Sequence, residues 1–294
     1  MKNEQIRQYS ALFSDDSDLP KQPADNKFVL FVDVLGFASL TESHPLDINA
    51  IKALERTFSE DFVRGFSCGA YTPLIKAFVG FHQSLKWIID RELMEHSLTS
   101  ITFSDSAFVA TSHLHEAANI AVDLIKSLIS RGIPVRIGIA YGSFAALRFR
   151  SDIVPDGGDH AAHFLGTGVV RSHKTESCGI DGLRILLHPS IDQSLYVNGY
   201  IQSPKNDRRI SVMECSEDEC CNDLGVRYEL DYWQFRPTEE VRVWHKFQDM
   251  WDSAPDSAKR HYQATAEAIN RMRIGQGELP LNNFHRRTLP RKKK

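Results

Sequence analysis

Short apolar runs separated by turn residues predict a set of β-strands in this chain. The run Phe28–Val34 carries apolar side chains at both parities, which is typical of a strand buried on both faces. Two further runs flank Ser104–Asp105–Ser106 and predict a hairpin with an acidic tip. The predicted strands are Phe28–Val34, Ser100–Phe103, Ala107–Thr111, Pro134–Phe144 and Leu183–His188.

Apolar residues at helical spacing predict helices between these strands. In His113–Ser130 the apolar positions form one stripe, and Gly132 follows as the residue that ends the helix. Gly138 and Gly142 lie inside the strand Pro134–Phe144 and predict that another segment approaches its backbone closely. The predicted helices are Asp47–Phe66, Leu74–Met94, His113–Ser130, one entered from a loop in Gly166–Ser177, a short one beginning in Pro189–Leu195, and Ala254–Ile274.

This order of elements predicts an α+β fold with helices on one face of a mainly antiparallel sheet. Beyond residue 200 the pattern weakens, and Arg227–Tyr232 and Val241–Trp244 are candidate strands there. The predicted units are a flexible N-terminal arm (1–27), a main domain (28–200), a C-terminal α/β extension packed on the core (201–280) and a basic tail (281–294).

Composition narrows the class of protein. With 294 residues, of which 42% are hydrophobic, the chain can bury a large core. A net charge of -3 gives no electrostatic reason to bind nucleic acid or an anionic membrane. The sequence shows neither an apolar run of membrane-spanning length nor a signal peptide, so we expect a cytoplasmic protein.

The five cysteines agree with a reducing compartment, because they are odd in number and irregularly spaced. Cys215, Cys220 and Cys221 lie close together in the sequence. They form no C-x-x-C pair and no second cluster follows, which disfavours a zinc site.

Two of the predicted strands end beside a single carboxylate each. Asp33 lies in the run FVLFVDVLGF, and Asp105 lies in TFSDSAFVA. Either aspartate alone is explained as a strand-end or turn residue. Together they would form an oxygen-rich site for hard divalent cations such as Mg²⁺ or Mn²⁺. Two such metal ions on a triphosphate are a common route to phosphoryl transfer.

Four motifs in order carry a family resemblance. They are FVDVLGF, FSDSAFVA, VRIGIAYGSF and FLGTGVVRSHKTES. As an ordered set, from about Phe28 to Pro189, they resemble the class III nucleotide cyclase domain. Within that superfamily the chain is most similar to the Pycsar pyrimidine cyclases of bacterial antiphage defence, which make cyclic UMP or cyclic CMP. The resemblance implies a ferredoxin-like, palm-type sheet and makes residues 28–200 the cyclase domain.

The resemblance also implies roles for individual residues. Asp33 and Asp105 would bind two metal ions per site, Mn²⁺ or Mg²⁺, with the carbonyl of Val34 as a further ligand. Gly36 would let backbone N–H groups approach the triphosphate closely. The substrate-binding residues of this strand and turn would be Phe31, Val34, Leu35, Gly36 and Phe37. The implied reaction is attack of the ribose 3′-oxygen on the α-phosphorus with loss of pyrophosphate.

The chain departs from the purine cyclases where that family reads the base. The positions of the base-reading Lys and Asp fall on Ile101 and Phe164, and neither side chain can form a hydrogen bond with adenine. These departures favour a smaller pyrimidine ring, and the resemblance alone favours UTP over CTP. The uridylate cyclase that this implies has a cytidylate cyclase as its alternative.

The transition-state residues of the family are altered as well. The family's Asn and Arg fall on Val170 and Lys174. Lys174 can supply a positive charge to a phosphate but lacks the bidentate fork of arginine, and Arg171 is a nearby substitute. These changes favour a second reading, in which the domain binds a nucleotide without catalysis. The two retained acids argue against it, because burying them without a function would be costly.

The resemblance implies a homodimer, because class III cyclases build their sites across a head-to-tail interface. It also implies a nucleoside triphosphate substrate and a separate effector protein that reads the cyclic nucleotide. The segment 47–94 is long for the family, and nothing in the sequence explains it. The sequence GGDH at Gly157–His160 is similar to the signature of diguanylate cyclases, but it lies in a polar loop, which disfavours that function.

Overall fold

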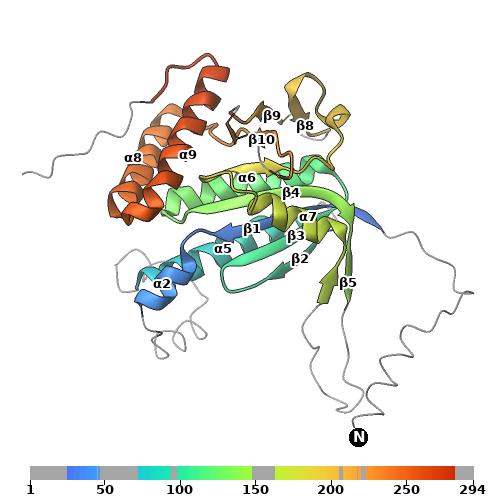
Figure 1. Cartoon of the computed structure of the whole chain (residues 1–294), viewed down its shortest axis with the longest axis horizontal. Helices are drawn as coiled ribbons and strands as arrows, with labels where there is room; N and C mark the ends of the chain where they lie inside the picture. Colours follow the sequence, from blue (N-terminus) through green and yellow to red (C-terminus); the bar gives the residue numbers. More distant parts are fainter. Residues whose placement is uncertain are drawn as a thin grey trace, which may run out of the picture.

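The computed structural model describes residues 25–44, 46, 72–93, 98–147, 163–204, 208–216, 218–219 and 223–281. Its centre is an eight-stranded sheet with the strand order β2-β3-β1-β4-β7-β10-β9-β8 (Figure 1). The strands of this sheet are β1 Asn26–Val34, β2 Thr99–Thr102, β3 Ser106–Thr111, β4 Val135–Ser143, β7 Ile185–Leu187, β8 Tyr200–Gln202, β9 Arg209–Glu214 and β10 Tyr228–Leu230. A separate two-stranded ribbon consists of β5 Ala145–Leu147 and β6 His163–Leu165.

The sheet is antiparallel except where β4 pairs with β7 in parallel. The predicted α+β class with a mainly antiparallel sheet is therefore confirmed. The helices are α2 Phe37–Ser43, α5 Pro73–Leu93, α6 Leu114–Arg131, α7 Thr167–Glu176, the 3-10 helix η1 Gln193–Gly199, α8 Pro237–Ser253 and α9 Asp256–Gly275.

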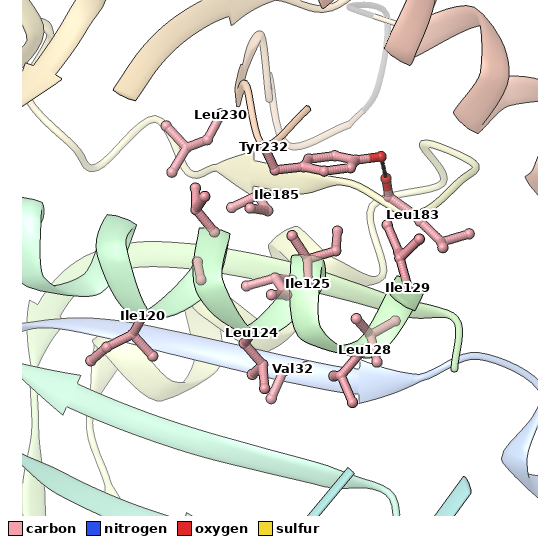
Figure 2. Packing of buried hydrophobic residues seen from close by; sticks show 14 of the residues in the cluster. Val32, Ile120, Leu124, Ile125, Leu128, Ile129, Leu183, Ile185, Leu230 and Tyr232 are labelled. Carbon is pink, nitrogen blue, oxygen red and sulfur yellow. Dashed lines mark hydrogen bonds between the residues drawn. The ribbon is translucent and has the colours of Figure 1, made fainter. Parts of the chain in front are cut away.

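Alternate residues of β1 enter two different cores. Leu30 and Val32 belong to the main core, which α5, α6, α8 and α9 also supply. Figure 2 shows Leu124 and Leu128 of α6 close to Val32. Val29 and Phe31 face the other side of the sheet and form a smaller cluster. Helix α7, which was predicted from Gly166–Ser177, packs on that second face. The expectation that helices cover only one face of the sheet was therefore wrong, because the two glycines of β4 leave room for a helix on the other face.

The two glycines of β4 explain how α7 approaches the sheet. A Cβ atom at Gly138 would lie 2.3 Å from the carbonyl oxygen of Ser172 and 2.6 Å from the backbone nitrogen of Glu176. A Cβ atom at Gly142 would lie 2.6 Å from the backbone nitrogen of Gly168. The predicted close approach to this strand is therefore confirmed, and the approaching segment is α7.

The C-terminal part continues the same sheet. β10 pairs with β7, and β9 and β8 follow it at the sheet edge. The buried residue Arg184 forms ion pairs with the equally buried Glu229 and, at 2.8 Å, with Glu219. Arg271 of α9 joins the same two acids at 3.2 and 3.3 Å. This network stabilises the packing of α9 on the sheet. Moving α9 away would remove Arg271 from the two acids, and a buried charge that loses its partner is strongly destabilising.

One predicted strand is wrong. Val241–Trp244 is not a strand but lies inside α8, where Val243, Trp244 and Phe247 are buried at helical spacing. The short helix expected to begin in Pro189–Leu195 is confirmed as the 3-10 helix η1, which begins at Gln193. It begins there because the side chain of Asp192 accepts a hydrogen bond from the backbone of Ser194.

The other predicted strands and helices are confirmed, apart from those outside the described residues. Helix Asp47–Phe66, the GGDH loop, Cys220 and Cys221 lie outside, as do most of the arm and of the basic tail. The division at residue 200 stays a prediction. Across the part of the chain that the structure describes, no helix combines the length and the apolarity that crossing a bilayer would require.

We expect Gly138→Ala to lower the free energy of unfolding by about 2 kcal/mol or more, because the new methyl group would force α7 away from β4. Gly275→Ala is the matched control, since a Cβ atom there would lie 3.6 Å from Met213 in ordinary contact. That control should be neutral or stabilise α9 by less than about 1 kcal/mol. Urea denaturation measures both, and equal stabilities of the two variants would contradict the packing described.

Candidate active site

The two predicted metal-binding acids lie side by side at one end of the central strands. Asp33 is near the end of β1 and pairs with Ser106 of β3, while Asp105 lies in the turn between β2 and β3. The backbone nitrogen of Val34 donates a hydrogen bond to the carbonyl oxygen of Asp105 at 2.9 Å. Antiparallel pairing of β1 with the acidic hairpin therefore brings together two carboxylates that are 72 residues apart in the sequence.

Asp33 lies in a strongly perturbed electrostatic environment. Burial is the main cause that raises the pKa of this half-buried carboxyl to about 7. The negative charges of Glu176 and Asp105 raise the pKa further, and the guanidinium of Arg136 opposes them. A bound cation would remove this cost, since a positive ion between carboxylates favours their charged form.

Arg136 and Glu176 are neighbours of the acids that were not predicted. Arg136 lies opposite Asp33 in the β1–β4 pair, and its guanidinium forms an ion pair with Glu176 at 2.7 Å. It also donates a hydrogen bond to the carbonyl oxygen of Ile180 at 3.0 Å. Arg136 lies in the motif VRIGIAYGSF, but only the register of β1 against β4 shows that it faces Asp33.

The turn after β1 is built around one glycine with a left-handed backbone. Gly36 has a φ angle of +77°, which glycine adopts without strain and other residues rarely adopt. Leu35 donates its backbone N–H to the carbonyl oxygen of Pro134 at 2.9 Å, which ties the turn to the start of β4. Phe37 is buried and begins α2 immediately afterwards.

The two predicted base-site residues both neighbour Phe108. Ile101 pairs with Phe108 across β2 and β3, and the ring of Phe164 lies 4.8 Å from that of Phe108. On the neighbouring strand β1, which flanks β3 on the side opposite β2, the ring of Phe31 lies 4.5 Å from that of Phe108. Phe103 completes the group at 5.9 Å from Phe164 and is 44% exposed. The structure thus gathers these positions into one aromatic cluster, next to the hairpin that carries Asp105.

Helix α7 presents the altered transition-state positions to solvent. Val170 is 54% exposed, and Lys174, one helical turn further on, is exposed as well. Arg171 instead donates a hydrogen bond from its guanidinium to the carbonyl oxygen of Tyr141 at 2.9 Å. In this arrangement Arg171 holds α7 to β4, and Lys174 is the more exposed of the two cations.

The donor set fits a hard divalent cation that a substrate helps to coordinate. Across the described ranges, no three His, Cys, Asp or Glu side chains are grouped to hold a metal ion. Asp33 and Asp105 supply two carboxylates, and Mg²⁺ and Mn²⁺ commonly bind through one or two carboxylates together with substrate phosphates and water. The raised pKa of Asp33 agrees with a site designed to hold positive charge.

Comparisons with known proteins give structural neighbours only. No protein-family model matches the chain, and no curated protein matches its sequence. A bacterial light-regulated adenylyl cyclase aligns over 84% of this chain and 68% of its own, with 11% identity and a TM-score of 0.46. At these values the likeness establishes neither an activity nor a substrate.

Two further structural alignments also combine low sequence identity with a low TM-score. The guanylate cyclase domain of RhGC from Catenaria anguillulae, solved with GTP, aligns over 71% of this chain and 97% of its own, at 16% identity and a TM-score of 0.43. The adenylyl cyclase CyaB from P. aeruginosa aligns over 72% and 95%, at 15% identity and a TM-score of 0.39.

The pKa of Asp33 predicts a pH-dependent stability in metal-free buffer. Between about pH 4 and pH 7 the folded chain keeps Asp33 protonated while the unfolded chain ionises it, so the free energy of unfolding falls as the pH rises. Above pH 7 both states are ionised and the loss is complete. Asp33→Asn removes this loss, so the variant should gain stability over the wild type across that window. The upper limit of this gain at pH 8 is about 4 kcal/mol, because the pKa rises by about three units at about 1.4 kcal/mol each, and solvent around the half-buried group lowers the gain.

Urea denaturation at pH 4, 6 and 8 in the presence of a chelator measures this effect. Asp90→Asn is the control, because Asp90 lies in an exposed ion pair with Lys86 on α5. A stability difference between Asp33→Asn and the wild type that stays constant over the three pH values would refute the assigned environment of Asp33.

Proposed function

We propose that this protein is a metal-dependent nucleotide cyclase that converts UTP to 3′,5′-cyclic UMP and pyrophosphate. The observation that carries the proposal is the juxtaposition of Asp33 and Asp105 beside the Gly36 turn. Two acids and a phosphate-binding turn at one sheet end are what a reaction on a triphosphate requires. The motif order of the sequence supports the same function.

In this proposal each part of the site has a separate task. Asp33 and Asp105, with the carbonyl of Val34, would hold two Mn²⁺ or Mg²⁺ ions. The turn Leu35–Phe37 would hold the triphosphate through the backbone N–H groups of Gly36 and Phe37, because the N–H of Leu35 is bonded to Pro134. The bound ions supply Lewis acidity at the 3′-hydroxyl and at the leaving phosphates. The ribose 3′-oxygen attacks the α-phosphorus, the bond from that phosphorus to the bridging oxygen breaks, pyrophosphate leaves, and the hydroxyl proton passes to solvent. Lys174 places a positive charge on the phosphates.

The aromatic cluster supports a pyrimidine substrate. Ile101 and Phe164 offer no hydrogen-bonding group to a purine edge, and both lie next to Phe108. Exposed aromatic faces such as that of Phe103 can stack on a base. CTP is the alternative substrate, because stacking does not distinguish the two pyrimidines.

We further propose that the active unit is a homodimer with two equivalent sites at its interface. The exposed side of α7, with Val170 and Lys174, faces away from the sheet of its own chain. A two-fold interface would let this side complete the metal site of the partner. The cyclic nucleotide would serve as a messenger in antiphage defence, triggered by infection and read by a separate effector protein.

A second candidate is a cyclase-like module that binds a nucleotide without turning it over. The observation that favours it is Val170, an apolar residue at the position where the resembled family orients the ribose with Asn. This candidate retains nucleotide and metal binding at Asp33 and Asp105 but makes no cyclic product.

The direct test is to incubate the purified protein with ATP, GTP, CTP or UTP and Mn²⁺ and to identify the products by mass. We expect cyclic UMP from the wild type, and a loss of about 1000-fold or more in Asp33→Ala and Asp105→Ala, since metal ions supply several kcal/mol of stabilisation to the transition state. Asp90→Ala is the control for removal of an exposed acid. Nucleotide binding without any cyclic product would establish the second candidate instead.

Complementation tests the shared site. Asp33→Ala damages the metal-binding half of the active site, and Lys174→Ala damages the half on α7. If the two halves of each site come from different protomers, a heterodimer of the two variants retains one intact site. Co-expression should restore about a quarter of the wild-type activity, because half of the randomly formed dimers are mixed. Activity no higher than the sum of the two separate variants would place both residues in one protomer's site.

A further inference from the structure

A cavity of about 670 Å³ lies behind the Gly36 turn, on the side of the sheet that α5 and α6 cover. Its lining includes Val34, Leu35 and Gly36 of the turn and Met250 and Ala258 of the α8–α9 pair. Figure 1 shows α2 and the α8–α9 pair at the same end of the sheet. The volume is in the range of pockets that bind molecules of nucleotide size.

The interior of this cavity is apolar, while its edge carries hydroxyl groups. The apolar lining residues are Leu40, Ala77, Ile133, Leu183, Met250 and Tyr262. The serines Ser39, Ser253 and Ser257 are also part of the lining. Such a surface suits a molecule with an apolar or aromatic body and a polar group at one end.

Three cations surround the same cavity: Lys76, Arg131 and Lys246. Within the described residues, none of the three forms an ion pair with a carboxylate. Burial lowers the pKa of Arg131, and no neighbouring acid opposes that effect. The lining includes one carboxylate, Asp249, so positive charge predominates.

The position of Lys246 concentrates this charge. A Cβ atom at Gly132 would lie 2.8 Å from the Cε atom of Lys246, so the end of this side chain lies over the last turn of α6, which also carries Arg131. The carbonyl groups at the C-terminus of a helix attract a cation, which explains the presence of one of these positive charges. Further cations around one apolar cavity repel each other, and a bound anion would remove that repulsion.

We propose that this cavity is a binding site for a phosphorylated organic molecule of nucleotide size, which adjoins the metal site at Val34 but is lined by neither Asp33 nor Asp105. The phosphate would contact Lys76, Arg131 and Lys246, and the organic body would lie against the apolar interior. Because the cavity shares Val34, Leu35 and Gly36 with the phosphate-binding turn, its occupant would set the position of that turn. This last step rests on the proposed function, whereas the binding itself does not.

The test uses 8-anilinonaphthalene-1-sulfonate, a fluorescent anion with an aromatic body, as the probe. We expect one site per chain, with the dissociation constant raised at least about tenfold in the double variant Lys76→Gln/Lys246→Gln. Lys86→Gln is the matched control, since Lys86 lies on the same helix as Lys76 but pairs with Asp90 outside the cavity. Thermal unfolding confirms that all variants are folded.

Competition then defines the chemistry and the location. UMP or AMP should displace the probe, and the unphosphorylated nucleosides should not. Asp33→Ala should bind the probe as the wild type does, whether or not the protein is a cyclase. The proposal would be overturned if the double variant and Lys86→Gln had equal dissociation constants, or if Asp33→Ala lost probe binding. It would also be overturned if the nucleosides displaced the probe, or if neither the nucleotides nor the nucleosides did.

Discussion

The pairing of β1 with β3 on one side and β4 on the other is the constraint on which the candidate site depends. A slip of one residue in either pair would turn Asp33 from one face of the sheet to the other. The same two registers place Asp105 beside Val34 and Arg136 opposite Asp33. Two separate cores, one on each face of β1, hold these registers in place.

The candidate site requires a charged carboxylate at Asp33, whereas the stability of the metal-free fold disfavours one there. Burial and two neighbouring carboxylates disfavour its charged form, so the acid weakens the metal-free fold near neutral pH. Groups with such a perturbed pKa are concentrated at functional sites, because the chemistry there requires charges that the fold alone would avoid. Helix α7 contributes to the raised pKa of Asp33, since the two glycines of β4 allow the helix close enough to bring Glu176 toward Asp33.

Sequence patterns predicted the parts of the fold that depend on local physics. The hairpin around Asp105, the stripe of α6 and its end at Gly132 each follow from periodicity or from one residue's backbone preference. The prediction was wrong at Val241–Trp244, since a short apolar run suits a strand and a buried helix face equally. Arg136 and Glu176 were missed because nothing local marks them. They meet through the packing of α7 on β4, at residues 40 positions apart.

The sequence by itself determined the class of the fold, the two acidic strand ends and the requirement for glycine at position 36, because each depends on side-chain periodicity or on steric limits of the local backbone. Only the tertiary structure decided which charges surround Asp33 and which rings surround Phe108. It also decided that the cavity behind the turn lies between segments more than 200 residues apart, such as Leu35 and Ala258. Such contacts depend on register and on helix placement, which are set by the packing of the whole core rather than by any one segment.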